Sequence, residues 1–119
     1  MDAHRLQRVE AQVQKDLAEI FRQEAQQDFP GVLITVTSVR ITPDLSLARI
    51  QLSAFPTEEA AAVMQWTENH HKQLKNQLVR QMKGRLRKMP ELQFFRDDSL
   101  EAESEIDRIL RNGGESPIQ

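Results

Sequence analysis

The chain of 119 residues has no cysteine, which excludes disulfide bonds, thiolate metal sites and cysteine nucleophiles. The absence of cysteine fits a reducing compartment, and we expect a cytoplasmic protein. No apolar run approaches the roughly 20 residues that a membrane-spanning helix needs. The first ten residues also lack the apolar core of a secretory signal. We therefore expect no association with a membrane.

Signatures of catalysis are missing as well. The sequence contains neither a glycine-rich phosphate loop nor a nucleophile elbow. His70 and His71 are adjacent, so on a helix they point to different sides, whereas paired metal ligands on a helix are four residues apart. The acidic residues between Asp97 and Asp107 are explained by helix capping and a solvated face. We therefore expect no enzyme activity, metal site, cofactor or small-molecule substrate.

What the sequence does have is positive charge gathered in one place. Residues 69–90 hold seven of the 16 basic residues and no acid, so nine basic residues remain to face all 18 acidic ones elsewhere. Such an asymmetry indicates an anionic partner. The seven residues are Lys72, Lys75, Arg80, Lys83, Arg85, Arg87 and Lys88.

A helical projection places most of this charge on one side. At 100° per residue, four of the basic residues fall within an arc of roughly 80°, away from an apolar stripe that begins at Leu74. These four are Lys72, Arg80, Lys83 and Arg87. The alternative is a helix whose solvated face happens to be basic, since such faces are common. A face that serves only solubility usually mixes charges and gains ion pairs four residues apart, which this one cannot do.

The first half of the chain predicts a helix followed by a β-hairpin. Apolar residues three or four positions apart predict a helix over 3–27, which a proline and a glycine end. β-Branched residues then predict a strand over 32–41, with a bulge near Ser38 where the apolar phase changes. Alternation predicts a second strand over 47–55. The two strands are close enough in sequence to pair as an antiparallel hairpin.

The second half predicts a long helix, a short strand and a last helix. One helix, or two nearly coaxial ones, is expected over about 58–88, with a kink at Gly84 and an end at Pro90. A strand over 92–96 and a helix over about 100–111 follow. The order is α-β-β-α-β plus a C-terminal helix, an α+β domain whose three-stranded sheet is covered by helices. We expect one domain over 1–111 and a disordered tail over 112–119.

Several buried positions can also be predicted. Leu17, Ile50 and Leu78 lie centrally on three different apolar faces, so we expect them to share one core. His71 lies on the apolar stripe, which favours a hydrogen-bonded core histidine over a metal ligand. Trp66 is expected to pack against a neighbouring element, although stacking on a nucleic-acid base is the alternative.

The sequence resembles the bacterial ribosome-binding factor A family from Arg5 to Leu110. The matching motifs, weak singly but specific as an ordered set, are RLQRV at 5–9, TPDL at 42–45 followed by Ala48, PELQF at 90–94 and DDS at 97–99. The resemblance implies a type II KH-like fold. It also implies a monomeric, cytoplasmic and non-catalytic factor that binds the small (30S) ribosomal subunit and its RNA. Such a factor assists late maturation of 16S rRNA, notably near its 5′ end, and supports growth in the cold.

The resemblance and the charge pattern together predict the RNA-binding residues. KH domains clamp the nucleic-acid backbone with a Gly-x-x-Gly loop, which this family replaces with a kinked helix pair containing a small residue and a glycine. Here Gly84 is the candidate, and no glycine stands near Val79. The residues that we predict to contact phosphates are Lys72, Arg80, Lys83, Arg85, Arg87 and Lys88.

Two other functions remain open at this point. A protein–protein interaction module would use the exposed face or edge of the sheet. A general nucleic-acid-binding protein would bind duplex DNA as well as ribosomal RNA. If the basic residues are only a solvated face, the next surface to consider is the polar strand face at Arg49, Gln51 and Ser53.

Overall fold

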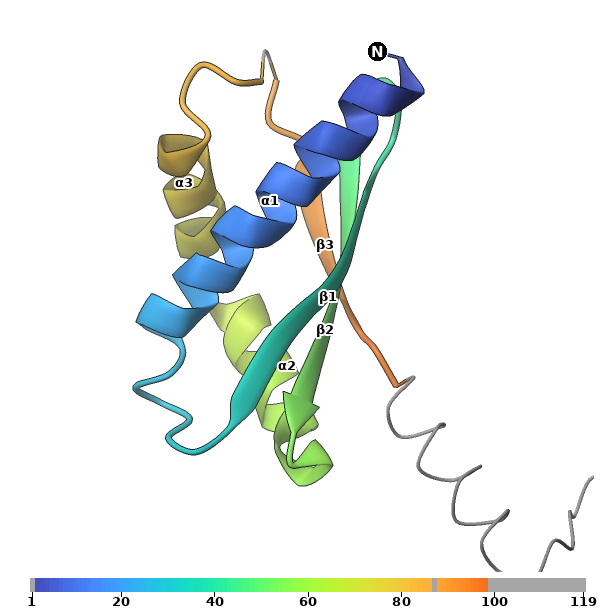
Figure 1. Ribbon diagram of the computed structural model, residues 1–119. Coiled ribbons are helices and arrows are strands. Elements are labelled where there is room, and N and C mark those ends of the chain that lie inside the picture. The colour runs from blue at the N-terminus through green and yellow to red at the C-terminus, as the bar shows by residue number, and fades with distance from the viewer. Residues whose placement is uncertain (1, 87, 99–119) are drawn as a thin grey trace, which may run out of the picture.

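The computed structural model describes residues 2–86 and 88–98, which form a mixed α+β domain with all three helices on one side of a three-stranded sheet (Figure 1). The elements, in order, are α1 (Ala3–Glu24), β1 (Leu33–Ile41), β2 (Leu47–Phe55), α2 (Ala60–Asn69), α3 (His71–Gln81) and β3 (Glu91–Arg96), with a short 3-10 helix over Thr57–Glu59 before α2. The predicted fold class is confirmed. The helix predicted over 100–111 and the tail over 112–119 lie outside the described residues.

The sheet has β2 at its centre, with β1 antiparallel and β3 parallel to it. The register of the hairpin shifts between Val36 and Ser38, which confirms the predicted bulge. The extra residue lets Val39 and Ile41 face the core like Val36, although the sequence changes phase there. Because a parallel pair needs a long crossover, α2 and α3 carry the chain back over the sheet before β3 begins.

The core lies between the sheet and the helical layer. Leu17, Ile50 and Leu78 have at most 1% of their surface exposed and belong to one cluster, as predicted. Thr67 is fully buried in α2, where its hydroxyl donates to the Val63 carbonyl at 2.8 Å. No helix within residues 2–86 and 88–98 is long and apolar enough to cross a membrane.

Trp66 and His71 both serve packing, as predicted. The Trp66 ring is buried, stacks on His70 with ring centroids 4.1 Å apart, and donates from Nε1 to Asp28 Oδ2 at 2.7 Å. His71 Nε2 lies 2.8 Å from the Leu92 carbonyl oxygen, and its ring meets Phe94 edge-on. These contacts fix α2 and α3 against the chain segments on either side of them.

The structure departs from the prediction over 58–88 in two respects. The segment forms two helices, which the sequence left open, but they divide at His70, whose φ of −108° and ψ of 15° are not helical, and not at Gly84. The second helix also ends at Gln81, and Gly84 takes a φ of 78° in the turn that follows. This left-handed conformation suits glycine and is typical of the turn that stops a helix. The prediction failed because Leu86 and Met89 keep a helical spacing while packing on the core from a loop.

Candidate nucleic-acid interface

The predicted RNA-binding residues lie on α3 and on the loop that follows it. Lys72 is in the first turn of α3 and Arg80 in its last, eight residues apart or about 12 Å along the axis. Lys83 and Arg85 belong to the turn after α3, and Lys88 to the approach to β3. These five residues are exposed. Arg87 lies outside the described residues. Because α3 ends at Gln81, Lys83, Arg85 and Lys88 do not continue its helical face.

Apolar side chains anchor the loop after α3 to the core, while its basic side chains stay exposed to solvent. Met82 is buried, Leu86 and Met89 pack against the core at partly buried positions, and Pro90 is fully buried. The Arg85 amide donates to the Met82 carbonyl at 2.9 Å and closes the turn. Anchored apolar residues thus alternate with exposed cations, so the loop presents charge from a fixed backbone and loses less entropy on binding.

Most of these cations have no counter-charge among the residues that the structure describes. Within the described part of the chain, no ion pair or side-chain hydrogen bond engages Lys72, Arg80, Lys83 or Arg85. Lys75 differs, because its Nζ lies 3.1 Å from Glu91 Oε2 and ties α3 to β3. The free cations therefore remain available to an external anion.

Lys88 faces the turn between β1 and β2. Hydrogen bonds from Thr42 and Ser46 lower the pKa of Asp44 to about 2, and the charge of Lys88 adds a smaller effect in the same direction. Lys88 therefore lies close enough to Asp44 for the two charges to interact.

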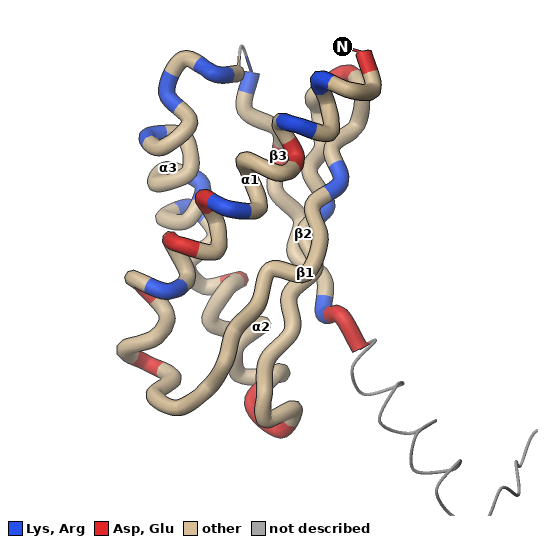
Figure 2. Tube along the Cα trace, in the orientation of Figure 1, with Lys and Arg blue, Asp and Glu red and all other residues tan. Residues whose placement is uncertain are grey.

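The structure adds two arginines that the sequence-based prediction missed. Arg5 and Arg8 on α1 line a groove of about 420 Å³ together with Arg85 from the turn after α3. Val9, Gln12 and Met82 complete the lining, which contains no carboxylate among the described residues. We call this the arginine groove. Figure 2 shows the basic segments at the start of α1 and in the loop after α3 at the same end of the molecule, while other basic segments lie further along both helices.

A signal for Arg5 and Arg8 was present in the sequence. The N-terminal turn of a helix carries partial positive charge and favours acids, yet α1 has no acid in its first turn and places arginines there and in the next turn. Asp2 caps the helix by accepting from the Arg5 amide at 2.9 Å. Cations at this end oppose the helix dipole, so a binding role explains them better than helix stability does.

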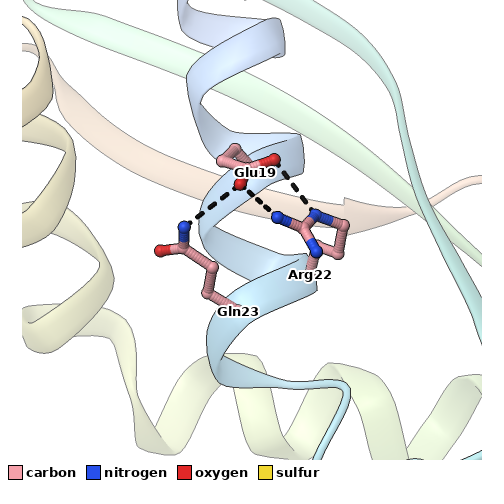
Figure 3. Close-up of polar contacts among 3 residues, drawn as sticks. All are labelled: Glu19, Arg22 and Gln23. Carbon is pink, nitrogen blue, oxygen red and sulfur yellow. Dashed lines mark hydrogen bonds and ion pairs between the residues drawn. The ribbon is translucent and has the colours of Figure 1, made fainter.

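Arg22, further along the same helix, shows the contrasting case. Its guanidinium pairs with Glu19, which also accepts from Gln23 Nε2 at 3.1 Å (Figure 3). The hydrogen bond from Arg22 lowers the pKa of the Glu19 carboxyl. The charge of Arg22 is therefore neutralised locally, unlike those of the arginine groove.

The arginine groove is chemically suited to phosphate. A guanidinium presents a planar fork of donors that matches two phosphate oxygens, and three such groups meet here over an apolar floor. A metal site has no support in the described residues, where no three His, Asp or Glu side chains are grouped to hold an ion. The arrangement can bind a phosphodiester backbone without selecting a base sequence.

Comparisons with known proteins agree with this picture. The family model of ribosome-binding factor A matches residues 5–110. A ribosome-binding factor A from Christiangramia forsetii is 34% identical over 98% of this chain and 89% of its own length. The one from Chlorobium limicola is 34% identical over 97% of this chain and 96% of its own length.

A crystal structure and a fitted homology model of a Thermus thermophilus protein share the fold. The crystal structure of its ribosome-binding factor A superposes with a TM-score of 0.63 at 27% identity, covering 76% of this chain and 94% of that one. A homology model of the same Thermus protein, fitted into a cryo-electron microscopy map of its complex with the 30S subunit, gives a TM-score of 0.60 at 28% identity over 75% and 91%. The type II KH-like fold is confirmed.

Proposed function

Because this chain belongs to the ribosome-binding factor A family, we propose that it binds the small ribosomal subunit through the arginine groove and the cations beside it. The observation that carries the proposal is the meeting of Arg5, Arg8 and Arg85, from two distant segments, around one groove whose described lining has no carboxylate. The same family, in Thermus, is seen in complex with the 30S subunit. Arg80 and Lys83 extend this surface, and Lys72 would add an outer contact. Arg87, predicted from the sequence as a phosphate contact, stays part of the proposal.

The proposed contact is with ribosomal RNA and is not catalytic. Arginines and lysines that touch phosphates supply affinity and position but carry little sequence information. Specificity then comes from the shape of a folded RNA site, to which the groove and the loop are fitted. The protein can favour one RNA conformation only by binding it more tightly than the other. We propose that the favoured conformation is one formed late in 16S rRNA maturation.

Co-sedimentation with isolated small subunits across a salt series tests the proposal. Each phosphate contact releases counterions, so the log–log slope of affinity against salt should be roughly −0.7 to −0.9 per contact. Changing Arg5, Arg8 and Arg85 together to glutamine should therefore weaken binding and flatten the slope by about two to three units. The thermal midpoint should stay close to that of the parent, because these side chains are exposed.

A matched control is available on the same helix. Arg22→Gln removes an arginine that is already paired with Glu19, so it should leave both affinity and slope unchanged. If the triple variant sediments like the parent at every salt concentration, the groove is only a solvated surface. Competition with duplex DNA separates a ribosomal factor from a general nucleic-acid-binding protein. Duplex DNA should displace a general nucleic-acid-binding protein from the small subunit, whereas a ribosomal factor should stay bound.

A further inference from the structure

The sheet has a second face, which the described helices leave uncovered. On it, six residues from three strands surround a shallow hollow of about 630 Å³. We call these residues the sheet platform: Ser38, Arg40, Arg49, Gln51, Gln93 and Phe95. Ser53, which the sequence placed on the same polar face, is buried with 8% exposure and does not contribute.

Strand register arranges the sheet platform in two rows. Arg40 pairs with Arg49, which pairs with Gln93, so the first row holds two cations and an amide. Ser38 pairs with Gln51, which pairs with Phe95, so the second row ends in an aromatic ring. Neighbouring strands lie about 4.8 Å apart and residues two positions apart lie nearly 7 Å apart. The platform therefore has the dimensions of one or two nucleotides.

The functional groups of the sheet platform are largely unengaged within the described residues. Phe95 is 43% exposed and makes no ring contact, and Arg49 forms no ion pair. Arg40 approaches Glu10 only at 3.8 Å and keeps 78% of its side chain exposed. Gln51 Oε1 accepts from Ser38 at 2.8 Å, which leaves the amide donors of Gln51 free.

We propose that the sheet platform binds unpaired nucleotides of single-stranded RNA, on a face separate from the arginine groove. Phe95 stacks on a base, Gln51 and Gln93 hydrogen-bond to base edges, and Arg40 and Arg49 hold the flanking phosphates. An exposed aromatic on a sheet, with arginines and amides around it, is how sheet-based RNA-binding modules read unpaired bases. Among the described residues, the lining has two cations and no carboxylate, which favours this anionic partner over a protein surface.

This inference goes beyond the proposed function, because a phosphate clamp alone needs no base contact. The arginine groove suits any folded backbone, whereas the sheet platform requires a base that is not stacked in a helix. A protein that has both can distinguish RNA whose strand is still unpaired from RNA whose strand has entered a duplex.

Titrating the full ¹⁵N-labelled chain with a single-stranded oligouridine octamer tests the proposal by NMR. The side-chain amides of Gln51 and Gln93 and the backbone amides of their row neighbours should shift on binding. Phe95→Ala should raise the dissociation constant by roughly 5- to 100-fold, as expected when one base–aromatic stack is lost. Phe55→Ala is the matched control, because Phe55 is a 63% exposed aromatic at the far end of the same face, paired with Leu33, and its loss should change little.

Binding by the arginine groove and binding by the sheet platform can be tested separately. The variant that neutralises Arg5, Arg8 and Arg85 should still show octamer-induced shifts on the sheet platform, even if its subunit binding is lost. The proposal is overturned if the octamer leaves Gln51 and Gln93 unperturbed, in which case the face is free for a protein partner. It is also overturned if Phe95→Ala binds as tightly as the parent, or if a duplex of equal length shifts the same residues equally.

Discussion

Both ends of α1 carry exposed arginines, but the charged side chains at the two ends have different partners. At the C-terminal end, Arg22 pairs with Glu19, Glu24 accepts from Gln77 on α3, and Asp28 beyond the helix accepts from Trp66. At the N-terminal end, Arg5 and Arg8 face another cation, Arg85, across the arginine groove. We call the C-terminal end of α1, with Arg22, Glu24 and Asp28, the paired end. Its charges hold elements of the fold together, whereas those of the arginine groove meet no carboxylate among the lining residues that the structure describes.

The difference shows that exposure and charge alone do not identify a binding site. Arg22 and Arg5 are both exposed arginines on one helix, and each has an acidic residue three positions before it. What separates them is the role of that carboxylate: Glu19 pairs with the Arg22 guanidinium, whereas Asp2 accepts from the Arg5 backbone amide. Surface ion pairs are worth little for stability, but they do remove a cation from the set that an RNA backbone can use.

Truncating a core side chain between the two ends of α1 should have the largest effect on the free energy of unfolding. Leu78 is fully buried in the cluster that joins α1, α3 and the sheet. Leu78→Ala should lower the free energy of unfolding by about 2–5 kcal/mol, because it removes apolar contacts and leaves a cavity. Urea denaturation measures this. A loss below half a kcal/mol would mean that the two ends are not supported by one core.

A change at the paired end should separate stability from binding. Trp66→Phe keeps an aromatic ring but removes the Nε1 donor, leaving Asp28 without its partner from α2. We expect a loss of about 1–2 kcal/mol in the free energy of unfolding, since a hydrogen bond to a charged group is broken. Affinity for small subunits, measured well below the unfolding transition, should equal that of the parent. Weakened binding by a fully folded variant would show that the paired end also takes part in recognition.

The smallest expected effect is a pH dependence at the turn beside the basic loop. The pKa of Asp44 is lowered from 3.8 to about 2, mainly by hydrogen bonds from Thr42 and Ser46. Because the folded pKa is below the unfolded one, this stabilisation is present above about pH 4 and is lost as the pH falls towards 2. The thermal midpoint of Asp44→Asn should therefore fall less than that of the parent between pH 5 and 2.5. Thr42→Val, which removes one donor, should show a drop between the two, and equal drops in all three proteins would contradict the assignment.

Sequence reasoning succeeded where local pattern and packing agree. The bulge near Ser38 followed from a change of apolar phase within one strand, and the shared core followed from three separate apolar faces. The end of α3 was missed because Leu86 and Met89 continue the helical spacing after the backbone has left the helix. The spacing of the apolar residues does not predict the left-handed conformation of Gly84.

The candidate site was predicted only in part, for a related reason. Periodicity finds residues that share an element, and it identified the exposed cations of α3 and its loop. It cannot show that Arg5 and Arg8 meet Arg85 nearly 80 residues later, because that contact depends on how α1 crosses the helical layer. Likewise, Gln93 and Phe95 join Arg49 and Gln51 only through the parallel pairing of β3 with β2.

The absence of native cysteine allows a direct test of which end of α1 faces RNA. A hydroxyl-radical-generating iron chelate can be attached to a single cysteine, at Lys83→Cys beside the arginine groove or at Gln27→Cys beside the paired end. Both positions are exposed in turns that follow helices. With small subunits bound, we expect localised 16S rRNA cleavage from position 83 and none above background from position 27. Cleavage from position 27 alone, or equal cleavage from both, would contradict this expectation.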